Sequence, residues 1–341
     1  MKSKRLKILL GVLSAVILAS AAYFVYTKYF QKDKSDTGIL SSVKKEKKAI
    51  CPLDGLSVNE AVANRHPLAI MIENHTDARP QVGLSEASLI YEAIAEGGIT
   101  RFMAVYVWGE SEKVGPVRSA RIYYVDWAEE FNVFYAHVGG NWDALEKIKA
   151  ENILDLDQFK YGTQAYWREA KAGKATEHTM FTSTKKLWSI AEKNKWDMTG
   201  SYPAFDFKDD PDVSQRPQNT TTTINFSTAN YQVKWIYDNS TNSYTRNQVN
   251  TPEIKAKNII AQWVDRKATV TKINESGWNM TVVGSGKAQI FLDGKVIEGT
   301  WKKDSRTSRT YFFDSSGQKI KFNRGQTWIE IVHNDTPVST K

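Results

Sequence analysis

The chain is poor in the residues that build disulfides and metal clusters: among 341 residues it has one cysteine, Cys51, and five histidines. A single cysteine excludes an intrachain disulfide and a thiolate metal cluster, so a fold outside the cell would depend on its hydrophobic core. The spacing of His75, His137 and His178 matches no metal-binding motif. A site of His75, Asp77 and His137 is a weaker alternative to structural roles for these histidines. The sequence therefore predicts no metal and no cofactor.

Excess charge is missing from most of the chain, although the formal net charge is +8. Residues 1–50 carry eleven basic residues against three acidic ones, which accounts for the whole excess and leaves 35 basic and 35 acidic residues after position 50. A nucleic-acid-binding protein needs positive charge on its folded surface to neutralise phosphates. We therefore do not expect a nucleic-acid partner.

Long apolar runs are absent except near the amino terminus, where Ile8 to Thr27 form a run of twenty residues without a charge after a basic leader. At about 1.5 Å per residue such a helix spans a hydrocarbon core of about 30 Å. The sequence predicts a cytoplasmic leader at residues 1–7, one transmembrane anchor at residues 8–27 and export of the rest of the chain across the cell membrane.

Two other interpretations compete with the anchor. Ala19-Ser20-Ala21 has the small-x-small form of a signal-peptide cleavage site, so cleavage after Ala21 stays open. The apolar run continues past that site, which favours a retained anchor. Residues 18–21 also have the form of a bacterial lipoprotein signal, but Ala21 stands where the lipid-bearing cysteine would be. Residues 28–50 are rich in Lys, Ser and Asp and are expected to form a flexible linker.

Residues 51–200 mix the patterns of strands and helices. Apolar runs at residues 68–73 and 133–138 have the length of strands. Helices are expected to begin at Ser119, Asn141 and Ser183, which are good amino-terminal caps. The sequence predicts an α+β or α/β ligand-binding domain here.

The carboxy-terminal region has a different pattern. Residues 197–222 collect Pro, Gly, Asp and Asn, as expected at a domain boundary. Residues 222–335 then alternate between apolar and polar positions in short runs separated by turn residues, among them Asp293-Gly294. We expect a β-rich carboxy-terminal domain.

Charged residues interrupt the apolar, strand-like sequence from residue 89 to residue 108. A hairpin turning at Gly97-Gly98 would set Glu96 opposite Ile99, Ile94 opposite Arg101 and Glu92 opposite Met103. Since side chains alternate along a strand, Glu92, Glu96 and Arg101 would share one face.

Buried charges in such a hairpin must be paired, with one another or with a ligand. The carboxylates of Glu92 and Glu96 are therefore candidates either for structural pairs with arginine or for catalytic acid and base groups. Four residues along a strand span roughly 13 Å, which is wider than a glycosidase pair uses. A helix in place of the strand would bring the two carboxylates together.

A second charged segment, GPVRSAR at residues 115–121, leads from a turn into the helix expected at Ser119. Helix amino termini and arginine side chains both favour anions. We expect a carboxylate or phosphate site that contains Arg118, Ser119 and Arg121. Pairing of these arginines with Glu92 and Glu96 is the alternative. Candidate members from other segments are Asn74, Arg79 and Arg101.

These segments also resemble a known family. PLDGL at residues 52–56, the run at residues 72–102, VGPVRSAR at residues 114–121 and two carboxy-terminal stretches at residues 286–301 and 317–332 are similar to the YerB-like envelope proteins of Gram-positive bacteria. The resemblance implies an exported, membrane-attached protein with an amino-terminal domain of unknown function and a smaller carboxy-terminal domain. Many members are described as lipoproteins, from which Ala21 departs.

The leading hypothesis is an extracytoplasmic, membrane-anchored envelope protein that binds a cell-wall polymer or an envelope partner through its arginines and carboxylates. One alternative is a glycan-active hydrolase or lyase that uses Glu92 or Glu96. Another is a scaffold for a membrane enzyme, with the β-rich domain as its docking surface. The sequence leaves open whether the protein catalyses a reaction, which ligand it binds and how many copies associate.

Overall fold

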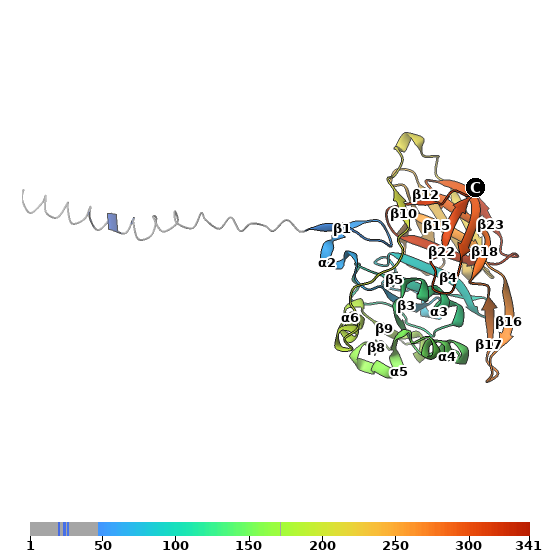
Figure 1. Cartoon of the computed structure of the whole chain (residues 1–341), viewed down its shortest axis with the longest axis horizontal. Helices are drawn as coiled ribbons and strands as arrows, with labels where there is room; N and C mark the ends of the chain where they lie inside the picture. Colours follow the sequence, from blue (N-terminus) through green and yellow to red (C-terminus); the bar gives the residue numbers. More distant parts are fainter. Residues whose placement is uncertain (1–19, 21–22, 25, 27–46, 171) are drawn as a thin grey trace, which may run out of the picture. The chain divides into compact units, whose positions relative to one another are not determined.

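The computed structural model describes residues 47–170 and 172–341, together with residues 20, 23–24 and 26. Contacts divide the chain into residues 1–47 and 48–341, and the account below concerns the second unit (Figure 1). Within the described ranges, no helix has both the length and the apolar character needed to cross a membrane. The anchor predicted at residues 8–27 lies almost wholly outside those ranges. The predicted linker ends early, because Lys48–Ile50 pairs with Ser57–Asn59 as a strand.

One mixed sheet of ten strands forms the centre of residues 48–341. In spatial order its strands are β20 (Tyr311–Asp314), β19 (Lys295–Lys303), β18 (Gly284–Leu292), β15 (Asn258–Trp263), β22 (Thr327–Val332), β4 (Leu89–Glu96), β5 (Ile99–Tyr106), β3 (Leu68–Glu73), β6 (Phe134–His137) and β7 (Leu154–Asp157). The two halves of the chain meet where β22 pairs in parallel with β4. Strands from both predicted domains therefore belong to one sheet.

A second sheet of five strands lies within the carboxy-terminal half. Its order is β14 (Ile254–Ala256), β13 (Ser243–Asn247), β12 (Gln232–Asp238), β11 (Thr221–Asn225) and β23 (Val338–Thr340). Four two-stranded pairs complete the strands: β1 (Lys48–Ile50) with β2 (Ser57–Asn59), β8 (Tyr166–Arg168) with β9 (Met180–Thr182), β10 (Asp206–Lys208) with β21 (Lys321–Asn323), and β16 (Arg266–Val270) with β17 (Ser276–Met280).

Helices are short and belong mostly to the amino-terminal half (Figure 1). The α-helices are α2 (Glu60–Ala63), α3 (Ile122–Ala128), α4 (Trp142–Ala150), α5 (Gln158–Tyr161) and α6 (Thr184–Lys193). The 3-10 turns are η2 (Thr76–Ala78), η3 (Glu129–Phe131), η4 (Gly162–Gln164), η5 (Thr176–His178), η6 (Val213–Gln215) and η7 (Ala229–Tyr231). The part of the chain described here is thus mostly strand with some helix, as the sequence predicts.

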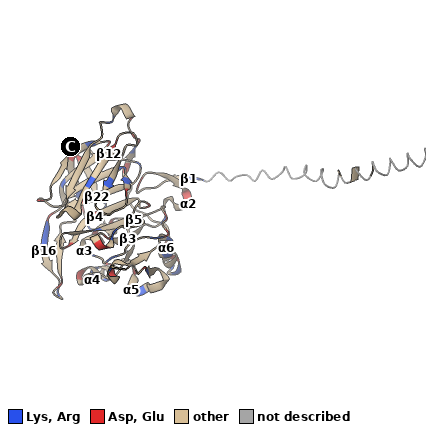
Figure 2. Cartoon of the chain, turned by 180° about the vertical axis from the view of Figure 1, so that it is seen from behind, with Lys and Arg blue, Asp and Glu red and all other residues tan. Residues whose placement is uncertain are grey.

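The central strands of the ten-stranded sheet, β15, β22, β4, β5, β3 and β6, are buried on both faces, which explains why they are nearly continuous apolar runs. On one face, alternate residues of β3, β4 and β5 pack with α6 and with the five-stranded sheet, where Trp235 and Trp328 meet edge to face at 5.2 Å. On the other face, the remaining residues of these strands pack with α3 and α4 around Trp127. Figure 2 shows both signs of charge spread over the folded part, in keeping with the charge balance after residue 50.

Several predicted element boundaries are confirmed. β3 covers residues 68–73, α4 begins after Asn141, and α6 begins after Ser183, whose side chain accepts a hydrogen bond from the Lys186 amide. The helix predicted to begin at Ser119 starts instead at Ile122 with Arg121 at its cap. The segment before it stays extended because the amides of Val117, Arg118 and Ala120 donate to carbonyls of neighbouring segments, including Met71 and Gly139.

Candidate functional site

Several polar residues of the amino-terminal half lie at one end of the large sheet, where four of its strands terminate. β3, β4, β6 and β7 run in the same direction, since β3 and β4 are both antiparallel to β5 while β6 and β7 are parallel to β3. Their last residues are Glu73, Glu96, His137 and Asp157. Crevices beyond the carboxyl ends of such strands are the usual ligand sites of open α/β sheets.

The charged hairpin has a different register from the predicted one. Glu96 lies opposite Ile99 as expected. A bulge between Ile94 and Glu96 shifts the pairing of the earlier β4 residues by one position, so that Glu92 lies opposite Phe102. The predicted pairings of Ile94 with Arg101 and of Glu92 with Met103 are therefore wrong. A shift of one residue moves a side chain to the other face of the sheet. Glu92 and Arg101 consequently lie on opposite faces.

Glu92 is fully buried in an ion pair that joins the two halves of the chain. Arg246 of β13 donates to one Glu92 oxygen at 2.6 Å, and the Thr100 hydroxyl donates to the other at 2.6 Å. The Arg246 guanidinium also lies over the ring of Trp328, 4.9 Å from its centre. The geometry favours a structural role for Glu92, because its charge is compensated inside the core.

A second carboxyl group, Glu330, lies beside Glu92 on the neighbouring strand β22. It accepts a hydrogen bond from the indole of Trp235 at 2.7 Å. Burial, together with the charge of Glu92, raises the pKa of Glu330 well above its usual range, although Arg246 and the Trp235 hydrogen bond act in the opposite direction. The protonated form of Glu330 is thereby favoured.

Glu96 pairs with two of the arginines that were candidates for anion binding. Arg101, which is buried, donates to one Glu96 oxygen at 2.8 Å and to the Ser119 carbonyl at 2.8 Å. Arg121 donates to the other Glu96 oxygen. Burial opposes ionisation of Glu96, but the charges of Arg101 and Arg121 outweigh it and lower the pKa of its carboxyl. This arrangement corresponds to the alternative in which the arginines pair with a carboxylate.

Arg79 and Asn74 also lie in an internal network. Arg79 is buried and donates to the Asn74 side chain and to the carbonyls of Asn230 and Val249, which belong to the second half of the chain. Burial lowers the pKa of Arg79. Asn74 in turn donates to Thr100 at 2.7 Å and to Gln248 at 3.2 Å. Ligand binding by these two residues stays a prediction.

Arg118 and Ser119 line a cleft of about 610 Å³ at the ends of β6 and β7. The Arg118 side chain is about a quarter exposed and pairs with Glu73 at 3.2 Å and with Glu177 at 3.6 Å. Arg168 lines the same cleft, is exposed, and donates to the Thr176 carbonyl. Among the described residues, no carboxylate lies within 4 Å of the Arg168 guanidinium.

The cleft also has an apolar rim. Phe159 of α5 lines it and is 76 % exposed, more than any other large hydrophobic side chain in the described ranges. Sequence reasoning missed Arg168 and Phe159, which lie in short elements between loops and carry no local motif. Only the tertiary structure brings them next to Arg118.

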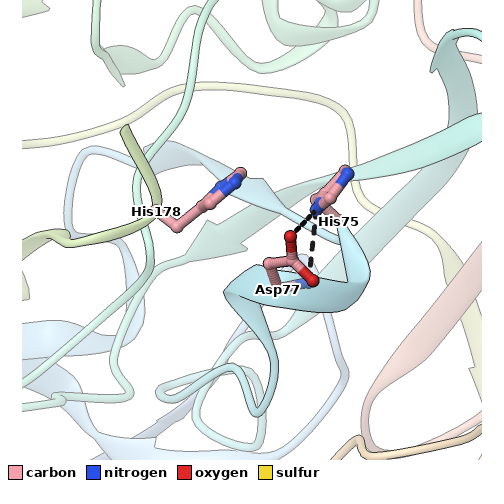
Figure 3. Close-up of side chains that lie close together, drawn as sticks. All are labelled: His75, Asp77 and His178. Atoms are coloured by element: carbon pink, nitrogen blue, oxygen red, sulfur yellow. Dashed lines mark hydrogen bonds and ion pairs between the residues drawn. The ribbon is translucent and has the colours of Figure 1, made fainter. Parts of the chain in front are cut away.

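Glu73, the buried partner of Arg118, also contacts a histidine. The second Glu73 oxygen accepts a hydrogen bond from His178 Nδ1 at 3.0 Å, and the His178 ring stacks on His75 with centres 4.8 Å apart. Together with Asp77, the two histidines offer three ligand atoms within 4.8 Å of one another (Figure 3). The weaker alternative placed His137 in this group, but His137 is buried at the end of β6 and contacts Asp155 and the Gly139 carbonyl.

Comparisons with known proteins agree with the fold. Residues 53–197 match the amino-terminal domain and residues 222–329 the carboxy-terminal domain of DUF3048, a protein family of unknown function. A protein of Bacillus subtilis strain 168 named "Putative lipoprotein YerB" is 30% identical over 293 residues, which cover 84% of this chain and 87% of that protein. The crystal structure of YerB from Bacillus subtilis aligns with a TM-score of 0.75 and 27% identity, over 86% of this chain and 100% of the crystallised one.

Proposed function

The chain belongs to the YerB-like DUF3048 family, and from this premise we propose that it is an envelope-associated protein that binds an anionic cell-wall polymer in the cleft formed by Arg118 and Arg168. The observation that carries the proposal is the charge of Arg168. Its guanidinium points to no carboxylate partner in the described part of the chain, while a second arginine lines the same cleft. Paired guanidinium groups bind carboxylate and phosphate oxygens with short, charge-assisted hydrogen bonds.

The rim of the cleft supports a polymer as the ligand. An exposed aromatic ring such as Phe159 offers an apolar surface against which the hydrocarbon face of a sugar or polyol unit packs. Asp157 and Glu177 also line the cleft and can accept hydrogen bonds from hydroxyl or ammonium groups. An anionic polymer of polyol or sugar units presents both kinds of group.

The geometry gives less support to a glycan-cleaving reaction at Glu92 or Glu96. Glu92 is fully buried and paired with Arg246, whereas Glu96 lines a different pocket, between the hairpin tip and the strands β16 and β17. Glycosidases need two carboxyl groups on either side of one bond. In this proposal both residues stabilise the fold.

Membrane attachment is the second part of the proposal. The Bacillus subtilis relative is named a lipoprotein, whereas Ala21 of this chain cannot carry a lipid. We propose that residues 8–27 serve as an uncleaved anchor. The full-length chain is then expected in the membrane fraction and in solution only after detergent, and amino-terminal sequencing should begin before residue 21. A mature chain that begins just after Ala21 would contradict the anchor.

Wall binding is tested by co-sedimentation of the full-length chain, solubilised in detergent, with purified Gram-positive walls that keep or lack their anionic polymers. Arg168→Gln is expected to weaken binding to complete walls about tenfold or more, since one charge-assisted hydrogen bond contributes about 1.5–3 kcal/mol. Arg324→Gln, which removes an arginine outside the cleft, is the matched control.

Three results would contradict this assignment. The first is equal wall binding by Arg168→Gln and the wild type. The second is wall binding that does not depend on the anionic polymers. The third is release of glycan fragments into the supernatant, detected by mass spectrometry, which would favour the glycan-active alternative instead.

A further inference from the structure

Two imidazoles and a carboxylate from distant segments meet beside the carboxyl end of β3 (Figure 3). His75 caps the turn η2, which follows β3 and contains Asp77, and His178 ends η5 about a hundred residues later. We infer that these three residues bind a divalent transition metal of the zinc class. The inference does not depend on wall binding by the cleft.

The donor set fits this class of metal. Two imidazole nitrogens and one carboxylate oxygen suit Zn²⁺ and its neighbours, whereas Ca²⁺ and Mg²⁺ prefer oxygen ligands alone. Three protein ligands are also the usual number in zinc sites that keep one position open for water or a ligand.

His178 already makes, through one ring nitrogen, the hydrogen bond that metal-binding histidines usually make. Its Nδ1 is occupied by the Glu73 carboxylate at 3.0 Å, so its Nε2 is the nitrogen left to coordinate a metal. Histidines that bind metals usually donate their other ring N–H to a carboxylate or carbonyl in this way. The second Glu73 oxygen pairs with Arg118, which holds the carboxylate itself in place. Glu73 is thus a positioning residue for the site.

His75 and Asp77 lie close to the required spacing. His75 Nδ1 is 3.7 Å from Asp77 Oδ2. Two ligand atoms at about 2.0–2.2 Å from one metal with a tetrahedral angle are about 3.3–3.5 Å apart. The His75 Nδ1 atom now accepts a hydrogen bond from the Asp77 amide at 3.2 Å, and a metal bond would replace that contact.

Binding an ion requires the side chains of His75 and Asp77 to move, and both are accessible enough to do so. Ring nitrogens coordinate in the plane of the imidazole, so the stacked rings of His75 and His178 cannot both point at one ion until one of them rotates. The His75 side chain is 31% exposed and that of Asp77 is 65% exposed. Both can therefore close on an ion around the fixed, buried His178.

The test is calorimetric titration of the full-length chain, free of any histidine tag, with Zn²⁺. We expect one ion per chain with a Kd of about 1 μM or lower, and visible ligand-field bands of four- or five-coordinate Co²⁺ when cobalt replaces zinc. His75→Asn and Asp77→Asn should each weaken zinc binding at least tenfold. Asparagine at position 75 can still cap η2, so the local fold is kept.

Asp209→Asn is the matched control, because Asp209 is an exposed carboxylate that lies in a different part of the chain and pairs with Arg324. Its zinc affinity is expected to equal that of the wild type. Absence of stoichiometric binding would overturn the inference. Equal affinity of His75→Asn, Asp77→Asn and Asp209→Asn would overturn it as well, since the ion would then bind elsewhere.

Discussion

Arg246→Met is expected to lower the free energy of unfolding by about 3–5 kcal/mol, because it leaves the buried carboxylate of Glu92 without its counter-charge. Methionine fills a similar volume over Phe102 and Trp328, so loss of packing is a small part of the effect. Both partners of the pair are at most 1% exposed, and solvent cannot replace the lost charge. Urea unfolding of the wild type and the variant measures the difference.

The double variant Glu92→Gln/Arg246→Met separates loss of the pair from loss of the arginine. Removing both charges leaves a neutral amide that Asn74 and Thr100 can still bond, so part of the lost stability should return. Equal stability of the single and double variants would contradict a role for the uncompensated charge.

Glu330→Gln is the matched control in the same pocket, and it has a distinct pH signature. Burial raises the pKa of Glu330, so near pH 5 and above the native state holds a proton that the unfolded chain releases. Stability from this group therefore falls as the pH rises from the usual carboxyl pKa of about 4.3 towards the raised value. Glutamine should remove that fall while keeping an acceptor for Trp235. If Glu330→Gln lowered the free energy of unfolding as much as Arg246→Met does, this account would be contradicted.

The register of the charged hairpin marks the limit of prediction from this sequence. The turn at Gly97-Gly98 and the pairing of Glu96 with Ile99 follow from local turn chemistry. The bulge before Glu96 has no local signal, because β4 and β5 are apolar on both faces and one register satisfies the pattern as well as the other. Only the partners that bury each face determine the register.

Contacts between distant segments explain the other differences between the predicted and the observed structure. Arg246 is 154 residues from Glu92 in the chain, and nothing near either residue points to the other. The run at residues 327–332 is predicted as a strand of the carboxy-terminal domain, but its place beside β4 follows only from the tertiary fold. By contrast, the helices after Asn141 and Ser183 depend on capping and spacing that a short segment contains.

In the candidate site, too, the sequence identifies some residues, whereas only the tertiary structure reveals the others. Arg118 and Ser119 are in the segment that the sequence singles out, and the structure brings them into the cleft. Arg168 comes from a short strand whose position depends on pairing with β9. Charge alone could not separate it from the many solvent-exposed arginines and lysines of the chain. The sequence likewise singles out the histidines but not their partners, since His178 rather than His137 lies beside His75.

Glu130→Ala is expected to destabilise the protein by about 3–5 kcal/mol, since it leaves Lys303 and Arg309 buried without a carboxylate. Glu130 lies in η3 of the amino-terminal half, whereas Lys303, at 3.0 Å, ends β19, and Arg309 lies beyond it at 3.4 Å. This cluster and the Glu92–Arg246 pair both join the amino-terminal half of the chain to the carboxy-terminal half. We therefore expect a single calorimetric unfolding transition, shifted to lower temperature in the variant.

The pH dependence of this loss identifies its cause. Burial lowers the pKa of Lys303 even with Glu130 present, and removal of the carboxylate lowers it further. The unfolded chain then binds a proton that the native variant lacks, so the stability of Glu130→Ala should rise with pH towards the ordinary lysine pKa of about 10.4. Glu298→Ala, which breaks an exposed pair with Lys287 at 3.7 Å, should change stability by less than about 0.5 kcal/mol. A loss for Glu130→Ala that is the same at pH 7 and pH 9.5 would mean that the missing hydrogen bonds to Thr310, and not the stranded charges, cause the instability.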